Sequence, residues 1–269
     1  MIVYPNCKIN LGLNVVSKRP DGFHNIESIL YPIPWFDILE IIPSKKNNFL
    51  FDGIQINCPE TENLCFKAHQ LLQKQKGIPE INLYLYKNIP SGAGLGGGSS
   101  DGAFTLRALN DLFSLNLDEE TLRGSASNLG SDCPFFIQDQ PCLVTGTGNI
   151  LMPLPATLKG YYIVVIKPDI SISTKEAYGM VTPKKAQKPL TEIIKLPVRD
   201  WKNLMVNDFE EPIFKKYPKI NSIKKLLYEK GAIYASMSGS GSAVYGLFEN
   251  KIDMTGDFQD CIFWNGRLA

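Results

Sequence analysis

The chain has 269 residues, enough for one large domain or two smaller ones, and its 28 basic and 27 acidic residues leave a net charge of +1. Hydrophobic residues make up 44% and charged residues 20%, as in an ordinary folded domain. This balance gives no electrostatic reason to expect nucleic acid or an anionic membrane as a partner.

The residues that usually bind zinc or form disulfides are few and poorly spaced. None of the six cysteines forms a Cys-x-x-Cys pair, and the histidines are only His24 and His69. No apolar run approaches the roughly 20 residues of a membrane span, and the first residues do not resemble a signal peptide. We therefore expect a reduced cytoplasmic protein with no protein-bound metal site.

The first half of the chain alternates between strand and helix patterns. Apolar alternation predicts strands over residues 8–16, 35–42 and 81–86. Apolar residues at helical spacing predict a helix over residues 63–74. A glycine-rich segment, Ser91 to Ser100, is followed by a second helix with Ala103, Leu106 and Leu109 on one face.

The second half begins after a segment rich in proline, residues 151–160, where we predict a boundary between domains 1–153 and 154–269. Beyond it the pattern predicts strands over residues 161–166, 232–236 and 243–248, and helices over residues 201–209 and 220–230. Helices and strands mix without a repeating order, which indicates an α+β fold in two lobes.

The glycine-rich segment, Pro90-Ser-Gly-Ala-Gly-Leu-Gly-Gly-Gly-Ser-Ser-Asp101, is the strongest sign of chemistry. Glycines let a backbone approach a ligand closely, and the N-terminus of the following helix attracts anions. No Lys-Ser/Thr follows the last glycine, which excludes a Walker A loop. The preceding strand alternates instead of being continuously apolar, which argues against a dinucleotide-binding fold. The segment predicts a phosphate-binding loop of another kind.

Three motifs in order resemble those of the GHMP kinases, a superfamily of small-molecule kinases. They are Lys8-Ile-Asn10-Leu-Gly-Leu, the glycine-rich segment Pro90–Asp101, and Ser236-Met-Ser-Gly-Ser-Gly-Ser242. The resemblance implies a two-lobed fold, with an N-terminal lobe like domain 2 of ribosomal protein S5 and a ferredoxin-like C-terminal lobe. It also implies ATP as co-substrate, Mg²⁺ with the nucleotide, and an active site in the cleft between the lobes.

Two further segments resemble the branch of this superfamily that acts on diphosphocytidyl-methylerythritol. They are Arg19-Pro-Asp-Gly-Phe23-His24 and Leu129-Gly-Ser-Asp132-Cys-Pro-Phe-Phe136, and the triple glycine Gly96–Gly98 fits the same branch. The resemblance implies ATP-dependent phosphorylation of the 2-hydroxyl of 4-diphosphocytidyl-2-C-methyl-D-erythritol. In that branch the reaction is a step of the non-mevalonate route to isoprenoid precursors.

The resemblance also assigns roles to residues. Asp132 would accept the proton of the substrate hydroxyl, and Lys8 beside it would orient that hydroxyl and offset charge. Phe23 and Tyr178 would stack on the two faces of the cytosine ring, His24 would hydrogen-bond its edge, and Asn10 would bind the methylerythritol or its diphosphate. The residues expected to bind ATP are Asn63, Pro90, Ser91, Gly92, Ala93, Gly94, Leu95, Gly96, Gly97, Gly98, Ser99, Ser100 and Gly239.

Three alternatives remain open at the level of sequence. Another GHMP kinase, of homoserine or mevalonate type, would have the same three motifs but lack the Asp-Gly-Phe-His segment. A mevalonate-diphosphate decarboxylase has the same fold and would release carbon dioxide. A non-catalytic nucleotide-binding module would bind ATP without turnover, although Lys8 and Asp132 argue against it. The sequence does not indicate an oligomeric state.

Overall fold

The computed structural model of the chain describes residues 1–56, 58–254, 256–258 and 260–268. The chain divides into two compact units whose segments alternate along the sequence. The first unit comprises Met1–Cys7, Trp35–Ser91 and Gly96–Gln140. The second unit comprises Lys8–Pro34, Gly92–Leu95 and Pro141–Ala269. The glycine-rich segment therefore passes from the first unit into the second and back.

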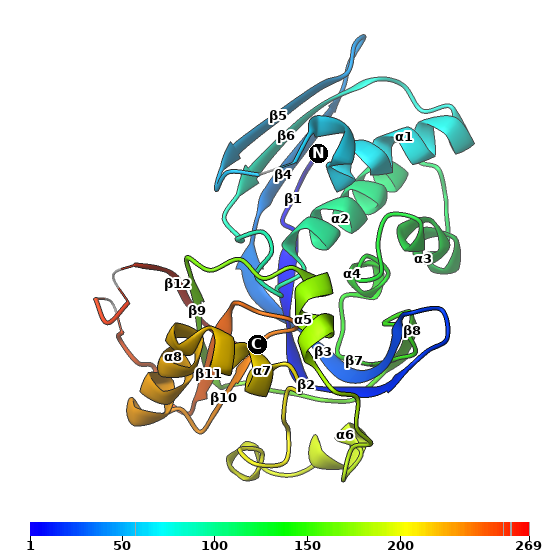
Figure 1. Ribbon diagram of the computed structural model, residues 1–269. Coiled ribbons are helices and arrows are strands. Elements are labelled where there is room, and N and C mark those ends of the chain that lie inside the picture. The colour runs from blue at the N-terminus through cyan, green and yellow to red at the C-terminus, as the bar shows by residue number, and fades with distance from the viewer. Residues whose placement is uncertain (57, 255, 259, 269) are drawn as a thin grey trace. The chain divides into compact units, whose positions relative to one another are not determined.

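Helices and strands follow one another in a mixed order (Figure 1). The strands are β1 (Ile2–Val3), β2 (Asn6–Lys18), β3 (His24–Phe36), β4 (Ile38–Pro43), β5 (Asn48–Gly53), β6 (Ile81–Lys87), β7 (Cys142–Thr145), β8 (Ile150–Pro153), β9 (Tyr162–Pro168), β10 (Tyr234–Met237), β11 (Val244–Phe248) and β12 (Cys261–Arg267). The helices are α1 (Leu64–Lys76), α2 (Gly97–Leu112), α3 (Glu119–Ser127), α4 (Phe135–Gln138), α5 (Thr174–Met180), α6 (Leu190–Ile193), α7 (Glu210–Lys216) and α8 (Pro218–Glu229), with 3₁₀ turns at Glu60–Glu62 and Val198–Asp200.

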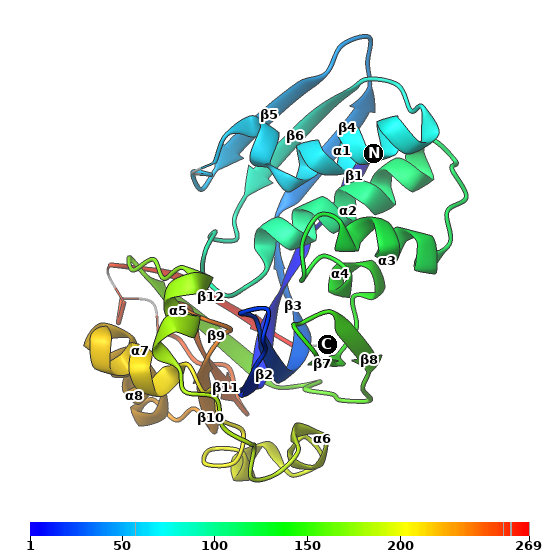
Figure 2. The ribbon, with the colours of Figure 1, turned by 45° about the vertical axis from the view of Figure 1, so that its right-hand side comes forward.

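The first unit is a sheet with strand order β1-β4-β6-β5, and α1 and α2 lie along one of its faces (Figures 1 and 2). Strand β5 runs parallel to β6, whereas β1 and β4 pair antiparallel. Strand β6 alternates strictly, with Ile81, Leu83 and Leu85 buried and Asn82 and Tyr86 exposed. This period of two is the pattern from which the sequence predicted the strand.

The same alternation turns the last residue of β6, Lys87, into the interior. Its side chain is 2% exposed, and its ammonium group lies between the carboxylates of Asp37 and Asp101, 2.6 Å from Asp101 Oδ2. Asp37 also accepts hydrogen bonds from the backbone N–H groups of Asn88 (2.6 Å) and Ile89 (2.9 Å). Two carboxylates thus share one lysine, and burial raises the pKa of Asp101 to about 7. The group ties the start of the glycine-rich segment to helix α2.

Replacing Asp101 by asparagine is expected to change how stability depends on pH. Because the pKa of folded Asp101 is raised from 3.8 to about 7, the folded state holds a proton that the unfolded state has lost between these values. The Asp101 contribution to stability therefore falls as the pH rises through this window. The free energy of unfolding, measured in urea from pH 4.5 to 7.5, should rise steadily for Asp101→Asn relative to the wild type. A difference between Asp101→Asn and the wild type that stays the same at every pH would contradict the assignment.

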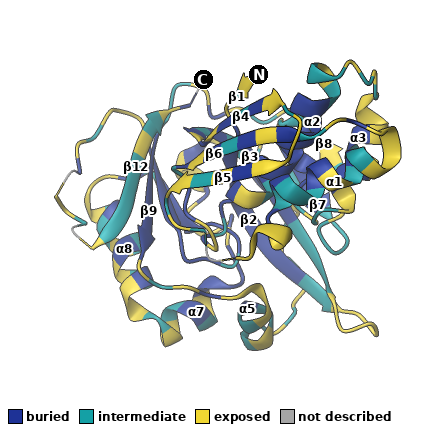
Figure 3. Cartoon of the chain, turned by 90° about the horizontal axis from the view of Figure 1, so that it is seen from above, coloured by how far each residue is buried: buried dark blue, intermediate teal, exposed yellow. Residues whose placement is uncertain are grey.

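The second unit contains two sheets, with strand orders β10-β11-β9-β12 and β2-β3-β7-β8. Helix α8 packs against β9, β10 and β11, and its Ile220, Ile223 and Leu227 join the core of this unit. Figure 3 shows how burial differs across this sheet: β9 is buried along nearly its whole length, whereas β12 at the edge is half-buried. The β7–β8 hairpin turns at residues 146–149.

Two of the predicted elements need correction. The helix predicted over residues 201–209 is wrong, because that segment is a series of turns that bonds to strand β2, and helix α7 begins only at Glu210. The strand predicted over residues 35–42 is interrupted at Asp37, whose side chain bonds to Lys87. In both places a tertiary contact outweighs the local pattern. The other predicted helices and strands are present, and the α+β class is confirmed.

Candidate active site

Two glycine loops that are far apart in sequence meet inside the second unit. A Cβ atom on Gly94 would lie 2.0 Å from the carbonyl oxygen of Ser238, and Gly94 has a φ of +76°. A Cβ atom on Gly239, with a φ of +55°, would lie 3.3 Å from the Cα of Gly94. The Ser238 hydroxyl donates to Gly94 O (2.8 Å), and Ala243 N donates to Ala93 O (3.1 Å). Both glycines are required because the backbones touch.

Strand β2 places Lys8 directly against these loops. Lys8 Nζ donates to Asn10 Oδ1 (2.6 Å) and to Gly94 O (3.0 Å), and its backbone N–H donates to Leu95 O (3.0 Å). Lys8 is 3% and Asn10 5% exposed. The Asn10 amide in turn donates to the hydroxyl of Ser28 (2.8 Å). Both polar atoms of the Asn10 side chain are therefore engaged within the protein, where they fix the direction of the lysine.

The other half of the glycine-rich segment opens helix α2 in the first unit. Gly96 is the N-cap residue in a left-handed conformation (φ 71°), no side chain caps the helix, and its first turn carries no acidic residue. The N–H groups of the first turn thus lack a capping partner and can donate to an anion. Ala93 and Leu95 are 2% and 1% exposed, and their carbonyl oxygens accept from Ala243 N and Lys8 N, so these two residues anchor the loop in the second unit.

A pocket of about 330 Å³ lies elsewhere in the first unit, beside the start of helix α1. It is lined by residues 51–56 together with Cys58, Glu60 and Asn63. The Oδ1 atom of Asn63 caps the helix by accepting from Cys65 N (2.9 Å). Because Oδ1 is used in this way, the amide N–H₂ of Asn63 is the part of the side chain left to donate to an occupant.

Aromatic side chains cluster at the start of β3 and on α5, within the second unit. The rings of His24 and Tyr178 stack, with centroids 4.9 Å apart and an interplanar angle of 19°. Phe23 is 65% exposed beside them. The tight turn before it is closed by Asp21, which accepts from Arg19 Nη2 (2.7 Å) and from Phe23 N (3.1 Å). The Arg-x-Asp-Gly-Phe-His pattern thus builds a turn that presents one aromatic ring to solvent.

Asp132 belongs to the first unit and lies, half-buried, in the turn that leads into α4. Phe135 N donates to its carbonyl oxygen (3.2 Å). The apolar residues that follow, Phe135 and Phe136, are fully buried and anchor the turn. Lys8 belongs to the second unit, so its approach to Asp132 remains a prediction.

Comparison with known proteins decides the family. The family profile described as "GHMP kinases N terminal domain" matches residues 63–146, and "GHMP kinases C terminal" matches residues 191–254. The 4-diphosphocytidyl-2-C-methyl-D-erythritol kinase of Parabacteroides distasonis is 52% identical over 271 residues, with 100% of both chains covered. The chain belongs to the GHMP kinase family.

Other relatives agree with this assignment. The enzyme of the same name from Thermodesulfovibrio yellowstonii is 41% identical, with 91% of this chain and 89% of its own covered. A crystal structure of 4-(cytidine 5'-diphospho)-2C-methyl-D-erythritol kinase superposes with a TM-score of 0.86 at 31% identity, covering 100% and 99% of the two chains. The mevalonate kinase of Methanococcus jannaschii shares the fold, with a TM-score of 0.73 at 16% identity and 100% and 98% covered. The predictions of a GHMP kinase fold, a kinase, and the diphosphocytidyl branch are confirmed.

The boundary predicted near residue 153 falls between the two segments of this kinase that the family profiles match, and it stays a prediction about the family domains. Among the described residues there is no group of three or more His, Cys, Asp or Glu side chains that could hold a metal ion. In the same part of the chain no helix has the length and apolar character needed to cross a bilayer.

Sequence reasoning missed several residues that hold the site of this kinase together. Ser28 bonds Asn10, and Ser238 bonds Gly94, from positions 18 and 144 residues away in sequence. Ser238 lies inside the third motif, so the motif itself could have pointed to it. No pattern near Ser28 in sequence indicates a functional role, because a serine on a strand is most often an ordinary surface residue.

Proposed function

We propose that this kinase transfers the γ-phosphoryl group of ATP to the 2-hydroxyl of 4-diphosphocytidyl-2-C-methyl-D-erythritol. The observation that carries the proposal is the contact of Gly94 with Ser238, which brings both glycine loops against Lys8, in a chain about half identical to relatives of that name. The product would feed the non-mevalonate route to isoprenoid precursors, and we place the enzyme in the cytoplasm.

The reaction is an in-line displacement at the γ-phosphorus. The hydroxyl oxygen of the substrate forms a bond to phosphorus while the bond from phosphorus to the bridging oxygen of ADP breaks. Asp132 receives the hydroxyl proton, and the ammonium of Lys8 orients the oxygen and offsets developing charge. Lys8 is held in one direction by Asn10 and Gly94, so little reorganisation is needed when the substrate binds.

The nucleotide would bind through backbone groups. The first-turn amides of α2 and the loop residues Gly94 to Gly98 donate to the phosphates, with Gly239 alongside. The adenine enters the pocket at residues 51–56, where the N–H₂ of Asn63 donates to the ring. A pocket of about 330 Å³ is adequate for such a ring.

Magnesium would arrive with ATP and neutralise the charge of the phosphates. The serines Ser99 and Ser100 follow the glycine loop and carry oxygen donors that suit this ion. Ser100 Oγ is buried without a hydrogen-bond partner in the described part of the chain, and Ser100 is fully buried. Ser99 is half-exposed and is therefore the better placed of the two hydroxyls.

The cytosine ring would bind between Phe23 and Tyr178. His24 stacks on the Tyr178 ring at a centroid distance of 4.9 Å, so a cytosine ring that binds to the same face takes its place. The displaced imidazole could then hydrogen-bond the edge of the base, as the family motif implies. Base stacking on an aromatic side chain contributes roughly 1–3 kcal/mol. Asn10 acts chiefly through Lys8 in this scheme.

Phe23→Ala is expected to raise KM for the diphosphocytidyl substrate by about 10-fold or more, because one stacking face is lost, and to leave KM for ATP within about 2-fold. Steady-state kinetics with each substrate varied in turn measures both. Phe36→Ala removes another exposed phenylalanine ring, 42% exposed, and serves as the control. Equal increases in both KM values for Phe23→Ala would mean that the ring has no part in cytosine binding.

The activity itself is tested by a coupled assay of ADP release. The purified chain is given ATP and, in separate reactions, the diphosphocytidyl compound, homoserine, mevalonate and mevalonate diphosphate. Turnover with the diphosphocytidyl compound, and with none of the other three, supports the proposal. Turnover with homoserine or mevalonate in its place, or carbon dioxide release from mevalonate diphosphate, would replace it.

A further inference from the structure

The segment before helix α7 is fixed to the strand that carries Lys8. Leu13 N donates to Val206 O (2.9 Å), and Asp208 N donates to Leu13 O (2.8 Å), which makes an isolated parallel bridge between Leu13 and Asn207. The carboxylate of Asp208 also accepts from Val15 N (2.8 Å). Residues 206–208 therefore have a fixed position relative to β2, within the second unit.

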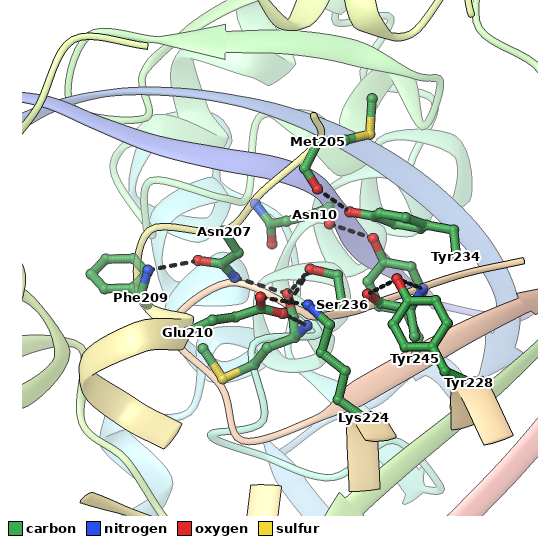
Figure 4. A network of polar contacts seen from close by, with 12 residues as sticks. Asn10, Met205, Asn207, Phe209, Glu210, Lys224, Tyr228, Tyr234, Ser236 and Tyr245 are labelled. Atoms are coloured by element: carbon green, nitrogen blue, oxygen red, sulfur yellow. Dashed lines mark hydrogen bonds and ion pairs between the residues drawn. The ribbon is translucent and has the colours of Figure 1, made fainter. Parts of the chain in front are cut away.

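The side chain of Asn207 reaches from this segment into the C-terminal glycine loop, residues 236–242 (Figure 4). Its Nδ2 donates to both Met237 O and Gly239 O, each at 2.8 Å, and its Oδ1 accepts from Phe209 N at 3.0 Å. Asn207 is 3% exposed. Both hydrogens of the amide are thus used to hold two carbonyl groups of one loop.

Glu210 holds the same loop as a hydrogen-bond acceptor, whereas Asn207 holds it as a donor. Its Oε1 accepts from Met237 N (2.8 Å) and from the Ser236 hydroxyl (3.1 Å), and its Oε2 is paired with Lys224 Nζ at 2.6 Å (Figure 4). An acceptor therefore holds the end of strand β10 while the donors of Asn207 hold the carbonyls that follow. The two side chains fix the direction of the backbone N–H and carbonyl of Met237 and of the carbonyl of Gly239.

The direction of the peptide groups decides what the loop can bind. Within the described residues, the backbone N–H groups of Gly239 and Ser240 have no hydrogen-bond acceptor. Gly239 has a φ of +55°, and successive N–H groups in such a turn form a concave site for an anion. The carbonyls of Met237 and Gly239 are turned to Asn207, and Ser238 O accepts from Gly241 N (3.0 Å), which leaves the N–H groups of Gly239 and Ser240 as the loop's unused donors.

We infer that Asn207 is a positioning residue for nucleotide binding: by holding two carbonyls of the C-terminal glycine loop, it keeps that loop's amides available to the phosphates of ATP. This inference rests on the proposed function. It concerns a residue that touches no substrate and acts through the loop. Without the two donors, the buried carbonyl of Gly239 loses its partner and that of Met237 keeps only a long contact with the Ser236 hydroxyl (3.4 Å), and a rotated peptide group would set an oxygen against the phosphates.

The test replaces Asn207 by aspartate. Asn207→Asp keeps the size of the side chain and the acceptor for Phe209 N, but sets an oxygen against the two carbonyls. We expect the Kd of a non-hydrolysable ATP analogue, measured by calorimetry without acceptor substrate, to rise by about 10-fold or more. KM for ATP should rise in step, whereas KM for the diphosphocytidyl substrate should stay within about 2-fold.

The matched control is Asn110→Asp, because Asn110 also donates to a backbone carbonyl, Leu117 O (3.3 Å), and accepts from Leu117 N (2.9 Å). It should leave both affinities unchanged. An unchanged Kd for Asn207→Asp, or an equal rise in both KM values, would overturn the inference. Asn207→Ala, which removes the donors without adding an oxygen, covers the case in which the aspartate variant does not fold. If neither folds while Asn110→Asp does, Asn207 supports the fold alone and the inference fails.

The calorimetric arm also separates this inference from the proposed function. It needs no phosphoryl acceptor, so it reports on Asn207 even if the chain acts on another alcohol. Absence of turnover by the wild type with the diphosphocytidyl compound would count against the proposed substrate and would leave the loop measurement valid.

Discussion

Asp132→Asn is expected to lower kcat by about two or more orders of magnitude and to leave the affinity for ATP nearly unchanged. The change keeps the size of the side chain but removes the group that accepts the proton of the attacking hydroxyl, and such a base contributes roughly 10²–10⁴-fold to the rate. The turn that holds it is anchored by the buried Phe135 and Phe136, so the fold should be preserved. Steady-state kinetics together with calorimetric titration of an ATP analogue measures both quantities.

The control is Asp139→Asn, seven residues further along the same segment. Asp139 accepts from Asn6 Nδ2 (2.8 Å), and asparagine can accept the same bond at this left-handed position, where φ is 52°. Its turnover should be close to that of the wild type. Near-normal turnover of Asp132→Asn would show that another group receives the proton, and a parallel loss in both variants would indicate damage to the segment.

Gly94→Ala is expected to lower the affinity for ATP by at least about 10-fold and to destabilise the protein. The new methyl group would lie 2.0 Å from the carbonyl oxygen of Ser238, at a φ of +76° that side chains rarely adopt. Overpacking of this kind costs about 1–3 kcal/mol, and the two glycine loops would have to separate. Thermal unfolding should show a midpoint lower by roughly 4–10 °C, and calorimetry should show the weaker binding.

Gly124→Ala gives a matched comparison for this change. Gly124 lies in helix α3 with nothing within 4 Å of the added methyl group, so alanine should be neutral or stabilise the helix by up to about 1 kcal/mol. ATP binding should not change in this variant. If Gly94→Ala bound ATP like the wild type and unfolded at the same temperature, the close contact between the two glycine loops would not exist in solution.

The predicted helices and strands follow from signals that act over a few residues. Helix α1 begins after Asn63, whose side chain caps it, and ends at Gly77 in the left-handed conformation with a φ of 65°. The cap of α3 at Asp118, followed by Glu119 and Glu120, is a signal of the same kind that could have predicted that helix. Such elements need no information from distant parts of the chain.

The errors occur where a distant partner decides the local structure. Residues 201–209 have an apolar spacing that suits a helix, yet Leu13 binds the backbone at Val206 and Asp208 and holds the segment in turns. Asp37 interrupts a strand because its carboxylate is taken by Lys87 and by two backbone amides. Each partner is more than 40 residues away in sequence, beyond the reach of any periodicity.

The sequence by itself determined which segments could bind phosphate, which residues were candidates for catalysis, and which family they resemble, because glycine content, helix starts and motif spacing are properties of short stretches. Only the tertiary structure decided that Gly94 lies against Ser238, that Lys8 is directed by Asn10, and that Asn207 holds the second loop. These are contacts between side chains and backbones brought together by the sheets of the second unit. A hydrogen bond of this kind depends on position in space to within a few tenths of an ångström, and local sequence does not specify it.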